Sequence, residues 1–135
     1  MPFRIHHIHI KAADPRSCAE WWEKAFAIKI LGDETRVFGD RFIRCTAEDG
    51  GMAVTISGPR TGEKLAPADA SPRFGLEHFA FESQNLEADI ARLLELGAEL
   101  QEAPVQVPNG PRVAFLRVPG DVRIELVELP KAASR

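Results

Sequence analysis

Four histidines are the residues of this 135-residue chain whose type and spacing point most directly to chemistry. Three of them, His6, His7 and His9, lie within the first nine residues, and the fourth, His78, lies in the second half. Imidazole nitrogens serve as metal ligands and as acids or bases near neutral pH. The role of the three histidines near the N-terminus depends on the secondary-structure elements that carry their side chains.

Residues 3–12 are predicted to form a β-strand, because apolar and polar side chains alternate along them with a period of two. Ile8 and Ile10 share one face of this strand, and His7 and His9 share the other. We expect the isoleucines to pack against a helix. The two histidines would then lie on the open side of a sheet, where a ligand can reach them.

A predicted helix follows the first strand in each half of the chain. Asp14 is the expected N-cap of the first helix, with Pro15 at its first position, and this helix runs to about residue 26. Asn85 is the expected N-cap of the second helix, and Gly97 is suited to end it. Further strands are predicted over 27–31, 37–38, 41–46 and 52–57 in the first half and over 76–82, 98–102, 112–118 and 122–128 in the second.

The two halves repeat the same order of elements. The sequence separation between His7 and His78 equals that between the two N-caps. The separation between Thr55 and Glu125 is one residue shorter, so these two residues also occupy equivalent positions. Neither half is long enough to form an ordinary domain alone. The repeat therefore predicts an α+β fold in which two βαβββ modules form a curved mixed sheet around a concave site.

The modules are predicted to make up one domain, residues 1–135. Module one covers 3–57 and module two covers 76–129. The segment between them, 58–75, contains three prolines and three glycines and is expected to be irregular. Both a mobile lid and an inert linker are consistent with its composition.

The repeat brings His7 and His78 to equivalent positions, and Glu125 lies on the last predicted strand. Two imidazoles and one carboxylate are typical of a divalent-metal site with open coordination positions, which suits Fe(II) and also Mn, Co, Ni or Zn. Substrate oxygens can occupy those positions, where the metal stabilises their negative charge. His9 shares the face of His7 and is the candidate catalytic residue, as a base, with a partner of a metal ligand or a solvated strand residue as the alternatives. The alternative for each histidine is a purely structural role.

Two arginines and one threonine are candidates to bind the substrate. Arg44 and Arg112 lie on predicted strands, and a guanidinium group suits a carboxylate or phosphate. Thr55, also on a predicted strand, offers a hydroxyl group. The alternative for each arginine is an ordinary surface salt bridge.

These motifs resemble those of the vicinal-oxygen-chelate superfamily, which contains lactoylglutathione lyase, methylmalonyl-CoA epimerase, bleomycin- and fosfomycin-resistance proteins and extradiol dioxygenases. The similar segments are 7–15 with the helix that follows, 75–82 and 119–128, and the resemblance covers residues 4–129. The motifs are specific for the fold of that superfamily and not for one reaction.

The resemblance implies metal ligands at His7, His78 and Glu125. The fourth ligand position of lactoylglutathione lyase falls on Thr55 or a neighbour in 52–57, where no carboxylate or imidazole stands. In the lyases and epimerases this ligand often acts as the acid or base. The remaining set of three is more similar to the iron site of extradiol dioxygenases, but those enzymes usually contain more modules, so the length of this chain favours a lyase.

We therefore expect a divalent-metal-dependent enzyme of the lactoylglutathione lyase type, a lyase or isomerase acting on a small oxygenated metabolite that chelates the metal through vicinal oxygens. The first alternative is an extradiol-type Fe(II) dioxygenase. The second is a non-catalytic resistance protein that binds a drug or metabolite, and the third is a sensing module. The resemblance also implies a homodimer, with the metal site either within one chain or shared between two.

The composition limits the partners. The chain contains 17 Lys and Arg against 20 Asp and Glu, a net charge of −3, which argues against a nucleic-acid partner. No apolar run approaches the ~18 residues that a membrane-spanning helix needs. The N-terminal residues do not resemble a secretory leader, so we expect a cytoplasmic protein. Cys18 and Cys45 belong to no metal-binding or redox motif and are expected to be buried.

Overall fold

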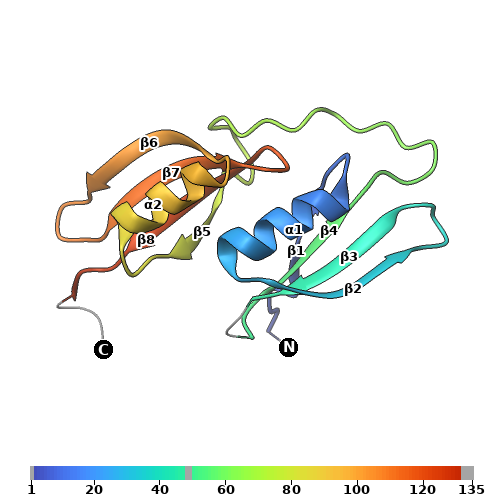
Figure 1. The fold of residues 1–135 in the computed structure, drawn as a ribbon, viewed down its shortest axis with the longest axis horizontal. Coiled ribbons are helices and arrows are strands. Elements are labelled where there is room, and N and C mark those ends of the chain that lie inside the picture. Colours follow the sequence, from blue (N-terminus) through green and yellow to red (C-terminus); the bar gives the residue numbers. More distant parts are fainter. Residues whose placement is uncertain (1, 48–49, 132–135) are drawn as a thin grey trace. The chain divides into compact units, whose positions relative to one another are not determined.

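The computed structural model describes residues 2–47 and 50–131. The chain divides into two compact units, Met1–Pro67 (unit 1) and Ala68–Arg135 (unit 2), and the boundary between them falls within 58–75. Each unit consists of a strand, a helix and three further strands (Figure 1). The predicted α+β class with two βαβββ modules is confirmed, and the strands form two mixed sheets, one four-stranded sheet in each unit.

Unit 1 contains β1 (His7–Lys11), α1 (Pro15–Phe26), β2 (Lys29–Thr35), β3 (Arg41–Thr46) and β4 (Ala53–Ser57). Its sheet has the strand order β1-β4-β3-β2, with β1 parallel to β4 and the other neighbours antiparallel. Helix α1 begins where the side chain of Asp14 accepts a hydrogen bond of 3.1 Å from the backbone N–H of Ser17. It ends at Ala27, whose backbone is left-handed, with φ of 55°.

Unit 2 contains β5 (Phe79–Glu82), α2 (Leu86–Glu95), β6 (Glu99–Gln106), β7 (Arg112–Val118) and β8 (Val122–Glu128). Its sheet has the equivalent order β5-β8-β7-β6, with β5 parallel to β8. Helix α2 begins where Asn85 accepts a hydrogen bond of 3.1 Å from the backbone N–H of Ala88. Gly97, with φ of 110°, follows the end of α2 as predicted.

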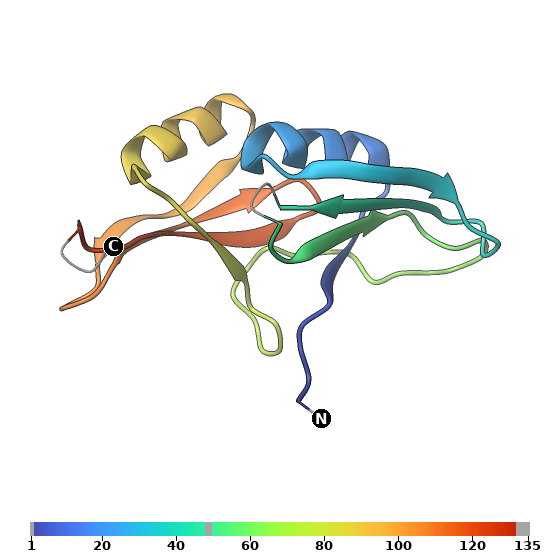
Figure 2. The same cartoon turned by 90° about the horizontal axis from the view of Figure 1, so that it is seen from below.

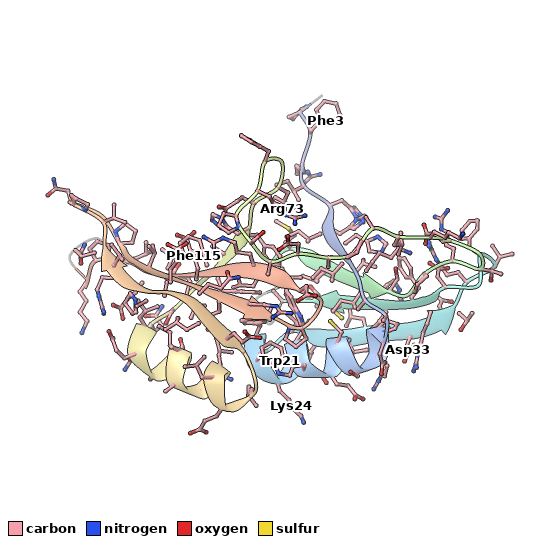
Figure 3. All side chains as sticks on the ribbon, turned by 90° about the horizontal axis from the view of Figure 1, so that it is seen from above. Phe3, Trp21, Lys24, Asp33, Arg73 and Phe115 are labelled. Atoms are coloured by element: carbon pink, nitrogen blue, oxygen red, sulfur yellow. The ribbon has the colours of Figure 1, made fainter. Side chains whose placement is uncertain are left out.

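In each unit the helix covers one face of its own sheet (Figure 2). The residues with fully buried side chains on that face include Ile43 and Ile56 in unit 1 and Leu116 and Ile124 in unit 2. Because successive strand residues point to opposite faces, their chain neighbours lie on the other face, which we call the open face of each unit. Phe115 shows this arrangement, since its side chain lies on the side of the sheet away from α2 (Figure 3).

The register of the strands reproduces the repeat. Thr55 on β4 is the register partner of His9 on β1 and of Arg44 on β3. Glu125 occupies the same place on β8, where its register partner on β7 is Phe115. The alignment of Thr55 with Glu125 that the sequence predicts is therefore confirmed.

The prediction of a strand at Val37 and Phe38 is wrong. Both residues lie in the turn between β2 and β3, and the backbone N–H of Arg36 donates a hydrogen bond of 2.9 Å to the carbonyl of Asp40 across it. Gly39, with φ of 85°, provides the positive φ that this reversal requires. The two apolar side chains therefore belong to a hairpin turn and not to the sheet.

The first strand of each unit is shorter than predicted. Of the strand expected over 3–12, only His7–Lys11 pairs, and the strand expected over 76–82 begins at Phe79, so that His78 directly precedes β5. Burial of Cys18 and Cys45 is confirmed, and it raises the pKa of each thiol to about 11. No helix in the described ranges has the length and apolar character needed to cross a membrane.

Candidate functional site

Two of the three predicted metal ligands lie side by side in unit 2. Nε2 of His78 is 3.1 Å from Oε1 of Glu125, and both side chains are half-buried. Strand β8 positions Glu125, and β5, which pairs with β8, begins at the residue after His78. Two ligand atoms that each bind a first-row metal at ~2.0–2.2 Å lie about 3 Å apart when they occupy neighbouring positions. The imidazole and carboxylate therefore fit such an ion.

The second ring nitrogen of His78 also contacts a carboxylate. Nδ1 makes a short hydrogen bond with Oε1 of Glu77, and the same oxygen accepts a bond of 3.1 Å from Nε of Arg123. These two hydrogen bonds, with the nearby positive charge, hold the pKa of the Glu77 carboxyl below its usual range. A ligating histidine whose other nitrogen donates to a carboxylate is a common arrangement at metal sites.

Arg123 is the most deeply buried charged side chain of this group, with 5% of its side chain exposed. Its Nη1 donates to Gln101 at 2.8 Å, and its Nη2 donates to Glu102 at 2.6 Å. Its guanidinium lies 4.0 Å from the centre of the Phe115 ring, and the His78 ring meets the same phenyl ring edge-on at 5.0 Å. Phe115 thus provides the apolar surface on which both groups pack.

The equivalent place in unit 1 is less enclosed. His7 is exposed on β1, and its Nδ1 lies 2.9 Å from Nδ1 of His6, so one ring donates and the other accepts. The ring of His9 lies 6.2 Å from that of His7. His6 therefore occupies in unit 1 the place that Glu77 occupies in unit 2. His7 keeps its Nε2 atom available for a ligand.

His9, the predicted base, is held on the open face of unit 1. Its Nε2 lies 2.7 Å from Oγ of Ser57, and its ring meets Phe42 edge-on at 5.6 Å. Partial burial of the ring lowers the pKa of His9 below 6.5, and the positive charge of Lys11 lowers it further. The lowered pKa favours the neutral imidazole, and in that form His9 can accept a proton.

Thr55 and Arg44 lie in the same row of the sheet as His9. Thr55 is buried at 7% exposure, whereas Arg44 is exposed and has no carboxylate partner among the residues that the structure describes. Gly32 on β2 is the register partner of Arg44 on β3, and a Cβ atom at Gly32 would lie 2.5 Å from Nη2 of Arg44. The missing side chain of Gly32 gives the guanidinium room to lie over β2.

Arg112, the other arginine predicted to bind substrate, lies on the helix-covered face. Its strand position has the same parity as the buried Leu116. It pairs with Glu128 at 3.0 Å and makes a short ion pair with Glu87 of α2, and the two carboxylates raise the pKa of Arg112. Glu128 also accepts a bond of 3.0 Å from the backbone N–H of Leu86. This group fastens α2 to its sheet and does not bring Arg112 to the open face.

Within residues 2–47 and 50–131, no three His, Cys, Asp or Glu side chains gather closely enough to hold a metal ion. The structure brings His78 and Glu125 together in unit 2, and His7 belongs to unit 1. Sequence reasoning assigned no role to Glu77 or Arg123. Arg123 had a usable signal, because it precedes Glu125 by two residues on the same face of β8.

Comparison with known proteins supports one family. The model of the Glyoxalase/Bleomycin resistance protein/Dioxygenase superfamily matches residues 4–126. No curated protein matches the sequence. A glyoxalase family protein from Bacillus cereus superposes with a TM-score of 0.83 at 19% identity, covering 96% of this chain and 95% of that one.

Two further solved structures share the fold. Glyoxalase I from Zea mays gives a TM-score of 0.72 at 20% identity, covering 92% of this chain and 44% of that one. An antibiotic-binding protein from Streptomyces sp. CB03234 gives 0.67 at 17% identity, covering 96% of this chain and 98% of that one. At these identities, the likenesses show the fold alone.

Proposed function

The chain belongs to the Glyoxalase/Bleomycin resistance protein/Dioxygenase superfamily, and on that premise we propose that it is a divalent-metal-dependent lyase or isomerase. Its substrate would be a small metabolite that chelates the metal through neighbouring oxygens. The observation that carries this proposal is the contact of 3.1 Å between Nε2 of His78 and Oε1 of Glu125. An imidazole and a carboxylate at this separation are suited to share one divalent ion.

His78 and Glu125 would hold the metal from unit 2, and His7 of unit 1 is the proposed third ligand. Nitrogen and oxygen donors of this kind suit Fe, Mn, Co, Ni or Zn. When bound, such an ion supplies Lewis-acid stabilisation of negative charge on substrate oxygens. Glu77 accepts the Nδ1–H of His78, which leaves Nε2 as the ligating nitrogen.

Residues of unit 1 would bind the substrate and move its proton. His9, whose lowered pKa favours the neutral imidazole, is the proposed general base. Arg44, whose guanidinium has no ion-pair partner within residues 2–47 and 50–131, would bind an anionic substrate group, and Thr55 offers its hydroxyl from the same row. Arg112 is left out of this set, because both Glu87 and Glu128 occupy its guanidinium.

One observation favours a second function. Thr55 aligns with Glu125 but cannot supply a carboxylate, so the donor set remains two imidazoles and one carboxylate. A facial set of that composition suits an Fe(II) dioxygenase. We propose the lyase or isomerase first and the dioxygenase second.

Anaerobic purification, metal quantification and a substrate screen with and without oxygen test the proposal. We expect stoichiometric metal in the parent and in the control Glu82→Gln, which removes an exposed carboxylate of β5, and loss of metal in Glu125→Gln. Turnover without oxygen consumption supports the lyase or isomerase, and oxygen consumption supports the dioxygenase. A metal-free parent that binds an antibiotic or metabolite without turnover would contradict both and favour a binding protein.

We also propose a homodimer in solution. Light scattering on the metal-loaded protein tests this. A monomer that retains stoichiometric metal would exclude a site shared between two chains.

A further inference from the structure

We propose that Glu77 and Arg123 are positioning residues, which fix the His78 ring with Nε2 facing Glu125. The inference rests on the proposed function for its link to a metal, since it concerns a ligand of that site. Neither residue touches the open coordination positions. They would act through the geometry and basicity of His78.

Arg123 can hold a carboxylate in place because its own orientation is fixed. Three nitrogens of its guanidinium donate in three directions, to Glu77 at 3.1 Å, Gln101 at 2.8 Å and Glu102 at 2.6 Å. The plane of the group rests on the Phe115 ring. With 5% of the side chain exposed, there is little room for another rotamer.

Glu77 transmits this constraint to His78. A carboxylate only accepts hydrogen bonds, so the bond from Nδ1 of His78 to Oε1 of Glu77 requires the proton on Nδ1. That bond fixes the ring orientation and directs the opposite nitrogen to Glu125, 3.1 Å away. A negatively charged acceptor also raises the basicity of the ligating nitrogen.

The fold itself does not require this pair, as unit 1 demonstrates. The places of Glu77 and Arg123 are taken there by His6 and Ala53, yet β1 and β4 pair in the same parallel register. The sheet therefore forms without a buried arginine at this position. Burying a guanidinium is costly unless it is fully paired, which favours a role in the site over a role in folding alone.

Two measurements on the same variants test the proposal. The first is the slowly exchanging Nδ1–H proton of His78 in the NMR spectrum of the metal-free protein. The second is the affinity for Zn²⁺, used as the probe, by titration calorimetry. In Glu77→Ala we expect loss of the proton signal and about a 10- to 100-fold weaker affinity, the usual effect of removing a carboxylate behind a ligating histidine.

The conservative and control variants separate positioning from folding. Glu77→Gln keeps an acceptor without charge, so it should retain the proton signal and lose less affinity than Glu77→Ala. Arg123→Met should change both readouts in the same direction as Glu77→Ala. Glu82→Gln alters an exposed glutamate that does not contact Arg123 or His78, so it should behave as the parent does. If Arg123→Met fails to fold, the Glu77 variants decide.

The outcomes distinguish this inference from the function on which it rests. If Glu77→Ala keeps the Nδ1–H signal and the parent affinity for Zn²⁺, the positioning role is overturned. If the parent binds no Zn²⁺, the proposed metal site is wrong, and loss of the proton signal in Glu77→Ala still supports the positioning of His78. The positioning role would also be overturned if Glu77→Ala and the control Glu82→Gln lost the same amount of thermal stability, because the effect of Glu77→Ala would then not be specific to His78.

Discussion

On the open face of unit 2, His78 lies against Glu125, and a buried arginine and a second glutamate stand behind it. On the open face of unit 1, the place of Glu125 is taken by Thr55, and the place of Phe115 by the exposed Arg44. The open face of unit 2 therefore presents ligand atoms suited to a cation, and the open face of unit 1 presents a guanidinium suited to an anion. A repeated fold has kept its backbone register while its two faces diverged in charge.

The largest expected effect tests whether the two faces serve one metal. His78→Ala should abolish stoichiometric metal, because it removes the nitrogen of the pair in unit 2. His7→Ala should also weaken the metal affinity by more than the ~10- to 100-fold that is typical when a residue behind a ligand is removed. His6→Ala, which removes only the ring beside His7, should fall within that range. Metal analysis and calorimetry measure all three, and full metal in His7→Ala would restrict the site to unit 2.

The second effect concerns the anion-binding character of unit 1. Arg44→Ala should weaken the binding of oxalate to the metal-loaded protein by about 10- to 100-fold, the cost of losing hydrogen bonds from a charged donor. Arg44→Lys should restore part of the affinity, because it keeps the charge and loses the fork. Arg117→Ala is the matched control, since Arg117 is exposed but already paired with Glu99 and Asp121. Equal loss in the control would remove Arg44 from the substrate site.

Much of this contrast could be predicted from the sequence, because it depends on local rules. The N-caps Asp14 and Asn85 follow from side-chain hydrogen bonding, and the repeat puts Glu125 at the position equivalent to Thr55, although the alternation along its own strand did not decide its face. The alternation along β7 puts Arg112 on the helix-covered face, and it was the better guide than the general affinity of arginine for anions. The alternation along the strand therefore indicated the correct face for Arg112, and the prediction that it binds substrate followed the residue type instead.

The group around Arg123 was beyond such rules. Glu77 precedes β5, so no strand periodicity fixes the direction of its side chain. Gln101 and Glu102 reach Arg123 from β6, where the pairing with β7 shifts register. A bulge changes which side chains face one another, and the sequence of β6 does not mark its position.

The helix ends provide a smaller contrast between the units. Gly97→Ala should destabilise the protein by about 1–2 kcal/mol, because alanine pays for the left-handed backbone that glycine adopts freely. The added Cβ would meet nothing within 4 Å, so this cost is backbone strain. Ala27 already carries such a strain in unit 1, with φ of 55°.

The reverse change in unit 1 is expected to have a smaller effect, because φ of 55° at Ala27 lies in the left-handed region that other residues can adopt, whereas φ of 110° at Gly97 lies outside it. Ala27→Gly relieves about 1 kcal/mol of backbone strain in the folded state. Glycine also increases the conformational entropy of the unfolded chain, which lowers the free energy of unfolding by ~0.4–1 kcal/mol. We expect a net change near zero. Thermal and urea unfolding of both variants measure the difference, and equal and opposite changes in the free energy of unfolding would show that the two backbone strains are the same despite the different φ angles.

The smallest effect is a pH dependence that we assign to His9. Burial lowers its pKa in the folded state below 6.5, so the unfolded chain binds the proton more readily. Stability is therefore complete above pH 6.5 and is lost as the pH falls toward the lowered pKa. His9→Gln should flatten this slope in urea midpoints measured above and below pH 6.5, whereas His6→Gln, at an exposed position, should leave it unchanged. An unchanged slope in His9→Gln would place the acid sensitivity outside the open face of unit 1, and would weaken the assignment of His9 as the neutral base.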